Sequence, residues 1–138
     1  MAEGGITPGQ AAEASIQVTE AQSASHLGSG SLQVFATPAM ILLIEEVSRK
    51  AIEPGLPPGR TTVGVEIRVR HLAPTPLGGT VRVRSEVTAV EGNRVTFRAE
   101  VWDELEKVGE GDHTRAVIEL ERFQRRVAAK SGTRRSPA

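Results

Sequence analysis

The chain has 138 residues, enough for one domain that buries about two-thirds of the surface of its unfolded form. Its 17 basic and 17 acidic side chains leave a net charge of zero, which argues against a nucleic-acid partner because no net field attracts a phosphodiester backbone. The chain has no cysteine, which excludes disulfides, thiolate metal sites and cysteine nucleophiles.

The first ten residues are polar and glycine-rich and lack the basic and apolar regions of a signal peptide. No stretch reaches the ~20 apolar residues that a membrane-spanning helix requires. We therefore expect a soluble, cytoplasmic protein without a membrane partner.

The first half of the chain predicts one short strand and one long helix. Residues Ala14–Val18 are a strand candidate, and a serine- and glycine-rich loop follows at His26–Ser31. Thr37 and Pro38 form a helix start signal, because a threonine hydroxyl caps orphan amides and proline suits the first turn. Residues Ala39–Ile44 are all apolar, so we expect protein on every side of this half of the helix.

The second half, from Arg60 to Phe123, predicts strands joined by short turns. Apolar residues alternate with polar ones at Val63, Val65, Ile67 and Val69, and the period continues at Val81, Val83 and Val87. Turns are predicted at Pro76–Gly79 and Glu91–Asn93, a third strand at Val95–Trp102 and a last one at Lys107–Phe123.

This order of elements predicts an α+β fold, in which a curled antiparallel sheet wraps around one long central helix. Residues 1–123 are expected to form a single domain. Residues 124–138 are rich in arginine and lysine and lack periodicity, so we expect a basic, disordered tail that takes no part in packing.

Three polar residues, Thr37, Glu45 and His71, lie where the local sequence predicts apolar burial. Thr37 has a structural explanation as a helix cap, but a helix start also offers free amides and a partial positive charge to an oxyanion. His71 follows the apolar side of its strand and precedes a proline- and glycine-rich stretch, so it suits either a core residue or a catalyst. We expect His26 and His113 to be structural or exposed.

Glu45 must be distinguished from Glu46, because each has a basic residue four positions later and an exposed ion pair is the default for both. Eight residues separate Glu45 from Thr37, slightly more than two turns, which leaves Glu45 nearer to the Thr37 side of the helix. A carboxylate on that side could activate water, attack an acyl carbon or orient a histidine.

At residue level the chain resembles the hotdog-fold acyl-CoA thioesterases of the fluoroacetyl-CoA thioesterase type. The resemblance spans about Val34 to Phe123. It rests on Val34–Thr37 with Glu45 eight residues later, Gly64, His71–Pro76, Thr114–Ile118 and Leu120–Phe123.

The resemblance implies that Thr37, Glu45 and His71 are catalytic and that Gly64 and Arg115 contact the substrate. It implies hydrolysis of a small or short-chain acyl-CoA, by water attack or through a transient acyl-enzyme, in a homodimer or higher homo-oligomer with neither cofactor nor metal. Small residues at Gly28–Ser31 replace the aromatic lid of the fluoroacetyl enzyme and leave Phe35 as the remaining aromatic cover. The alternative is a non-catalytic acyl-CoA-binding hotdog module or regulator.

Overall fold

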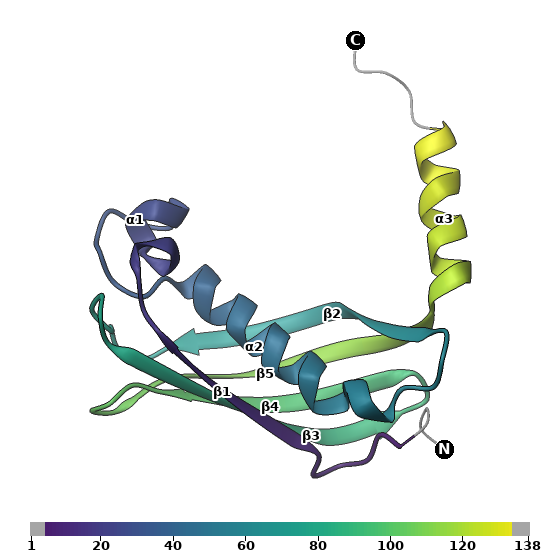
Figure 1. The fold of residues 1–138 in the computed structure, drawn as a ribbon, viewed down its shortest axis with the longest axis horizontal. Helices are drawn as coiled ribbons and strands as arrows, with labels where there is room; N and C mark the ends of the chain where they lie inside the picture. The colour runs from purple at the N-terminus through teal and green to yellow at the C-terminus, as the bar shows by residue number, and fades with distance from the viewer. Residues whose placement is uncertain (1–4, 134–138) are drawn as a thin grey trace.

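The computed structural model describes residues 5–133 and shows one five-stranded sheet with a helix across one face (Figure 1). All strand pairs are antiparallel, and the strand order is β1-β3-β4-β5-β2. The strands are β1 (Ala11–Gln17), β2 (Arg60–His71), β3 (Thr80–Glu91), β4 (Arg94–Trp102) and β5 (Lys107–Glu119). The long helix is α2 (Thr37–Ile52), and this arrangement confirms the predicted α+β hotdog fold.

Shorter elements connect these parts. Between β1 and α2 lie the 3-10 turn η1 (Glu20–Gln22) and the single-turn helix α1 (Ala24–Leu27), where a loop was predicted. Gly28, with φ of 75°, ends α1 in the left-handed conformation that glycine adopts most easily. A second 3-10 turn, η2 (Glu53–Gly55), follows α2. No helix within residues 5–133 is long and apolar enough to cross a lipid bilayer.

The core lies between α2 and the sheet. Met40, Ile44 and Val47 recur at helical spacing on the inward side of α2 and are at most 1% exposed. They belong to the same apolar cluster as Val83 and Val101. Burial of this stripe holds α2 across the strands and fixes which of its side chains face β2.

Protein does not surround the first half of α2, contrary to expectation. Leu42 is 56% exposed, and Ile41 is only half-buried. A single helix on a single sheet covers only the side of α2 that faces the strands, so the opposite side stays open. Leu42 and Pro38 instead help to line an apolar hollow of about 370 Å³ beside α1 and β1.

A β-bulge interrupts β2 and corrects the predicted alternation. Gly64 pairs with Arg115 and Glu66 with Thr114, so Val65 is the extra residue. Before the bulge, Thr62 is buried on the inward side, and after it Ile67, Val69 and His71 are the less exposed residues. Val65 is 46% exposed and Val63 lies on the opposite side of the strand from Thr62 and Gly64, so the single apolar side that was predicted from Val63 to Val69 is wrong at both valines.

The C-terminal segment is helical where the sequence predicted the end of a strand and a disordered tail. Strand β5 ends at Glu119, and α3 (Leu120–Thr133) projects away from the sheet (Figure 1). The placement of a domain boundary at residue 123 stays a prediction, and residues 134–138 lie outside the described part.

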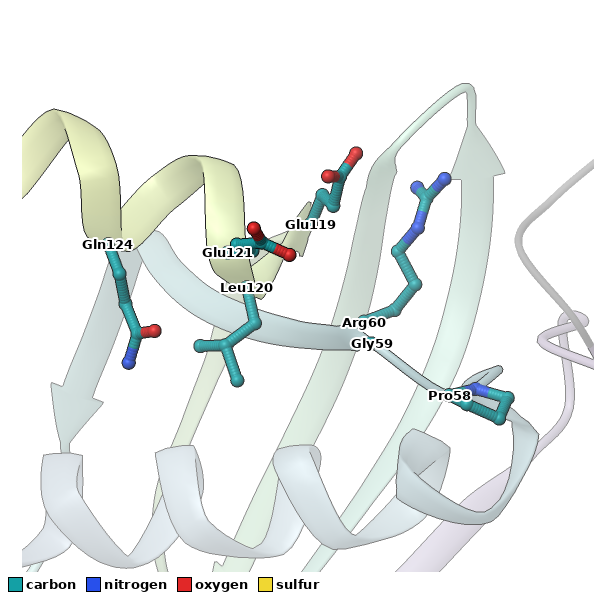
Figure 2. Close-up of a pocket in the computed structure, with 7 residues that line it drawn as sticks. All are labelled: Pro58, Gly59, Arg60, Glu119, Leu120, Glu121 and Gln124. Atoms are coloured by element: carbon teal, nitrogen blue, oxygen red, sulfur yellow. The ribbon is translucent and has the colours of Figure 1, made fainter.

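The junction of β2 and α3 borders an open hollow of about 500 Å³ (Figure 2). There the amide of Leu120 donates to the carbonyl of Gly59 at 2.9 Å, and Arg60 lies opposite Glu119 in the register of β2 and β5. Farther along α3, Phe123 and Val127 help to line a neighbouring hollow with Val63 of β2, so the side chains of this helix do reach the body of the domain.

Candidate active site

The first turn of α2 brings Thr37 to His71 at the end of β2. Thr37 Oγ1 lies 2.8 Å from His71 Nδ1. The N-cap residue is Ala36, which has no side-chain acceptor, so the expected cap by the Thr37 hydroxyl does not form. The hydroxyl and the uncapped first-turn amides therefore lie together at the positive end of the helix dipole.

The environment of His71 favours its neutral form. Burial lowers the pKa of the imidazole, and the backbone of Ala73 opposes this with a smaller effect. His71 Nε2 is buried and has no hydrogen-bond partner among the described residues. Because Nδ1 already contacts the Thr37 hydroxyl, a neutral His71 suits exchange of a proton at this point.

Phe35 is the aromatic neighbour of His71. The two rings meet edge to face with centroids 6.2 Å apart, and Phe35 is 1% exposed. Its amide donates to the carbonyl of Thr75 at 2.8 Å, and the Thr75 hydroxyl donates to Asp103. Phe35 thus forms a fixed wall beside the histidine.

Glu45 lies two turns farther along α2 and meets the middle of β2 and β5. Its Oε2 lies 3.8 Å from Arg115 Nη1, and the Glu45 side chain is 36% exposed against 8% for Arg115. A methyl group at Gly64 would lie 2.7 Å from the same carboxylate oxygen, so a side chain there would displace the Glu45 carboxylate from its present position. Glu46 is exposed, whereas Glu45 faces Arg115 and Gly64.

Three N–H donors of the Arg115 guanidinium contact neutral acceptors. Its Nε donates to Thr62 Oγ1 at 2.9 Å, its Nη2 to the carbonyl of Thr62 at 3.2 Å, and its Nη1 lies 3.2 Å from His113 Nε2. Burial lowers the pKa of the guanidinium, Glu45 opposes this, and Arg49 adds to it. A guanidinium has five N–H groups, so two remain for Glu45 or a ligand.

Two functional groupings result, and the structure gives no contact between them. Thr37, His71 and Phe35 lie at one end of the α2 and β2 contact, and Glu45, Gly64 and Arg115 lie near its middle. Eight helical residues rise about 12 Å, which exceeds the reach of one reacting carbonyl.

Sequence reasoning missed Thr62 and His113, which complete the Arg115 cluster. His113 is 1% exposed and stacks on Phe97, with ring centroids 5.9 Å apart. The signal was the alternation of β5, since His113 and Arg115 are two residues apart and share the inward side. Within residues 5–133, no group of three or more potential ligand side chains could hold a metal ion.

Comparisons with known proteins identify the family of this chain. The family model described as fluoroacetyl-CoA-specific thioesterase matches residues 18–121. A fluoroacetyl-CoA thioesterase from Streptantibioticus cattleyicolor is 42% identical over 99 residues, which are 72% of this chain and 71% of that protein.

Solved structures agree. The fluoroacetyl-CoA thioesterase FlK superimposes with a TM-score of 0.84 at 36% identity, covering 91% of this chain and 98% of that one. A thioesterase superfamily member from Thermus thermophilus gives 0.84 at 30% identity, with 94% and 98% covered. The chain therefore belongs to the fluoroacetyl-CoA-specific thioesterase family of thioester hydrolases.

Proposed function

We propose that this protein hydrolyses a small or short-chain acyl-CoA to CoA and the free acid, with Thr37, Glu45 and His71 as the catalytic set. The observation that carries the proposal is the 2.8 Å contact between the Thr37 hydroxyl and His71 at the uncapped start of α2. A hydroxyl, two backbone amides and a neutral imidazole at one point suit a thioester carbonyl that becomes an oxyanion.

In the water route, Glu45 takes a proton from water as the oxygen attacks the acyl carbon. The Thr37 hydroxyl and the first-turn amides stabilise the oxyanion, the carbon–sulfur bond breaks, and His71 positions the reacting groups and handles the proton that the departing thiolate takes up. In the acyl-enzyme route the Glu45 carboxylate attacks first, and water then cleaves the anhydride. Gly64 lets the substrate approach β2, Arg115 supplies charge beside it, and Phe35 covers the acyl group.

Structures of the similar FlK enzyme support the substrate class. One mutant of it was solved with fluoroacetate and CoA, and another with acetyl-CoA. These ligands belong to that protein, and the acyl group of the present chain is argued from its own residues. Where the family enzyme has an aromatic lid, the exposed segment 28–31 of this chain is small and polar.

The first prediction concerns the acyl group. We expect similar kcat/KM values for acetyl-, propionyl- and butyryl-CoA, because one methylene is worth only about 1–3 kcal/mol even in a closed apolar pocket. Fluoroacetyl-CoA should show no large preference. The measurement is release of free thiol from a panel of these esters. A preference of several orders of magnitude for the fluorinated ester would contradict the open pocket, and tight binding without turnover would favour the non-catalytic alternative.

The second proposal is a homodimer in which the two groupings of the site come from different subunits. Strand β2 is an edge strand of the sheet described above, and Leu42 leaves an apolar surface open on α2. A two-fold copy would bring the partner's Glu45 to Thr37 and His71, which the roughly 12 Å rise between them prevents within one helix.

Mixing two inactive variants tests this arrangement. Glu45→Gln and His71→Ala subunits carrying different tags would be coexpressed and the mixed dimers assayed. The isolated mixed dimers should show about half of wild-type activity, since each contains one intact site instead of two. Activity no greater than that of either variant alone would place both groupings in one subunit, and a monomer in light scattering with full activity would exclude the dimer.

A further inference from the structure

His113 is a buried titratable group that the proposed chemistry does not use. It lies on the inward side of β5, between Phe97 of β4 and the β-bulge of β2, and is 1% exposed. An ideal Cβ placed on Gly64 would lie 3.5 Å from His113 Cε1 and 2.7 Å from Glu45 Oε2. The imidazole therefore borders the same small space as the Glu45 carboxylate.

The two partners of His113 fix its tautomer. Nδ1 lies 2.8 Å from the carbonyl oxygen of Glu66, which can only accept, so Nδ1 carries the proton and donates. Nε2 lies 3.2 Å from Arg115 Nη1, which can only donate, so Nε2 must be unprotonated. Both contacts form together only in the neutral imidazole with hydrogen on Nδ1.

A second proton on His113 would break this arrangement. Protonated Nε2 would turn an N–H toward the buried guanidinium and set two cations 3.2 Å apart. The charged groups around it are Arg115 on β5 and, on α2, Glu45, which favours the proton, and Arg49, which acts on Arg115. From β2 only the Glu66 backbone faces the ring, since the Glu66 side chain is exposed. Burial is the largest effect on the imidazole and lowers its pKa.

We propose that His113 is a positioning residue that controls the decrease in activity at low pH. As a neutral acceptor it holds Arg115 beside Glu45 and Gly64, and its protonation releases Arg115. The inference rests on the proposed function for its consequence in catalysis, but the state of the imidazole is testable without turnover.

The first test is nitrogen NMR of the histidine rings in the full chain. Long-range proton–nitrogen correlation between pH 6.5 and 8 should show His113 with hydrogen on Nδ1 and a bare Nε2. An Arg115→Lys variant should change the Nε2 signal more than the Nδ1 signal. A ring with hydrogen on Nε2, or doubly protonated at pH 7.5, would overturn the proposal even if no acyl-CoA is hydrolysed.

The second test compares His113→Phe with His113→Gln, and uses His26→Gln as the control because His26 is exposed in α1. Phenylalanine keeps the stack on Phe97 but offers no acceptor, so KM at pH 8 should rise about ten- to a hundredfold with a smaller change in kcat. Glutamine places a non-titrating acceptor near the position of Nε2, so it should restore most of the lost affinity. With glutamine, one protonation step fewer should contribute to the decrease of kcat/KM at low pH.

The outcomes separate this inference from the proposed function. Two results would overturn the role of His113 and leave the proposed hydrolysis intact. One is a folded His113→Phe protein with the turnover and KM of wild type. The other is a His113→Gln protein whose kcat/KM decreases at low pH in the same way as that of wild type. If His113→Phe does not fold, the acid limb of His113→Gln decides alone. If the wild-type protein cleaves no thioester, the proposed function is wrong, and the NMR result still decides the protonation state of His113.

Discussion

Glu45→Gln is expected to lower kcat by about a hundred- to ten-thousandfold, the contribution that a positioned proton-handling group commonly makes. The amide keeps the size of the carboxylate in the narrow space above Gly64 but neither accepts a proton from water nor attacks carbon. Binding of CoA should change little. The measurement is single-turnover hydrolysis of acetyl-CoA.

Glu46→Gln is the matched control for this variant. Glu46 is on the same helix, one position later, and its side chain is exposed. It should retain wild-type kcat and KM. A folded Glu45→Gln protein, checked by circular dichroism, that turns over acetyl-CoA like Glu46→Gln would show that the carboxylate beside Arg115 is not part of the chemistry.

His71→Ala is expected to have the second largest effect, a loss of about a hundredfold or more in kcat/KM. The Thr37 hydroxyl would lose its partner at 2.8 Å, and no group at that point could exchange a proton. The pH profile should change as well. Burial lowers the pKa values of His71 and His113, so both imidazoles are neutral above their ordinary value of 6.5, and activity falls only as the pH drops below it.

In wild type the acid limb of log kcat/KM should therefore approach a slope of two, and in His71→Ala a slope of one, because only His113 then takes up a proton. The assay is residual hydrolysis of acetyl-CoA between pH 5 and 8. An unchanged limb in the folded variant would mean that His71 does not titrate in the active form.

The sequence predicted those parts of the fold that depend on local pattern. Pro38 and the apolar run after it determine where α2 lies, and alternation with short turns gives β3 and β4 within a few residues. Thr37, Glu45 and His71 were singled out because each is polar where burial is expected, and each has a polar partner on another element.

The remaining features depend on contacts between distant segments. The contacts of Arg115 with Thr62 became visible only once β5 was paired with β2, since the two residues are far apart in the sequence. The exposure of Leu42 depends on what covers α2, which the pattern of one chain does not encode. Helix α3 is an exception, because its leucine, glutamate, arginine, glutamine, alanine and lysine residues favour helix locally, and the prediction of a tail from the basic composition overlooked that preference.

Because of the bulge at Val65, the number of residues in β2 determines which of its side chains face the helix. Gly64 and His71 are seven positions apart and would face opposite sides of a regular strand, yet the extra residue lets both face the helix. Deleting Val65 would thus do more than shorten the strand. It would turn either the half that holds Thr62 and Gly64 or the half that holds His71 to the solvent side, while every residue assigned to the site remained in the chain. A one-residue gap at this position in a related sequence would therefore mark a protein that keeps the hotdog fold but has lost this arrangement of the site.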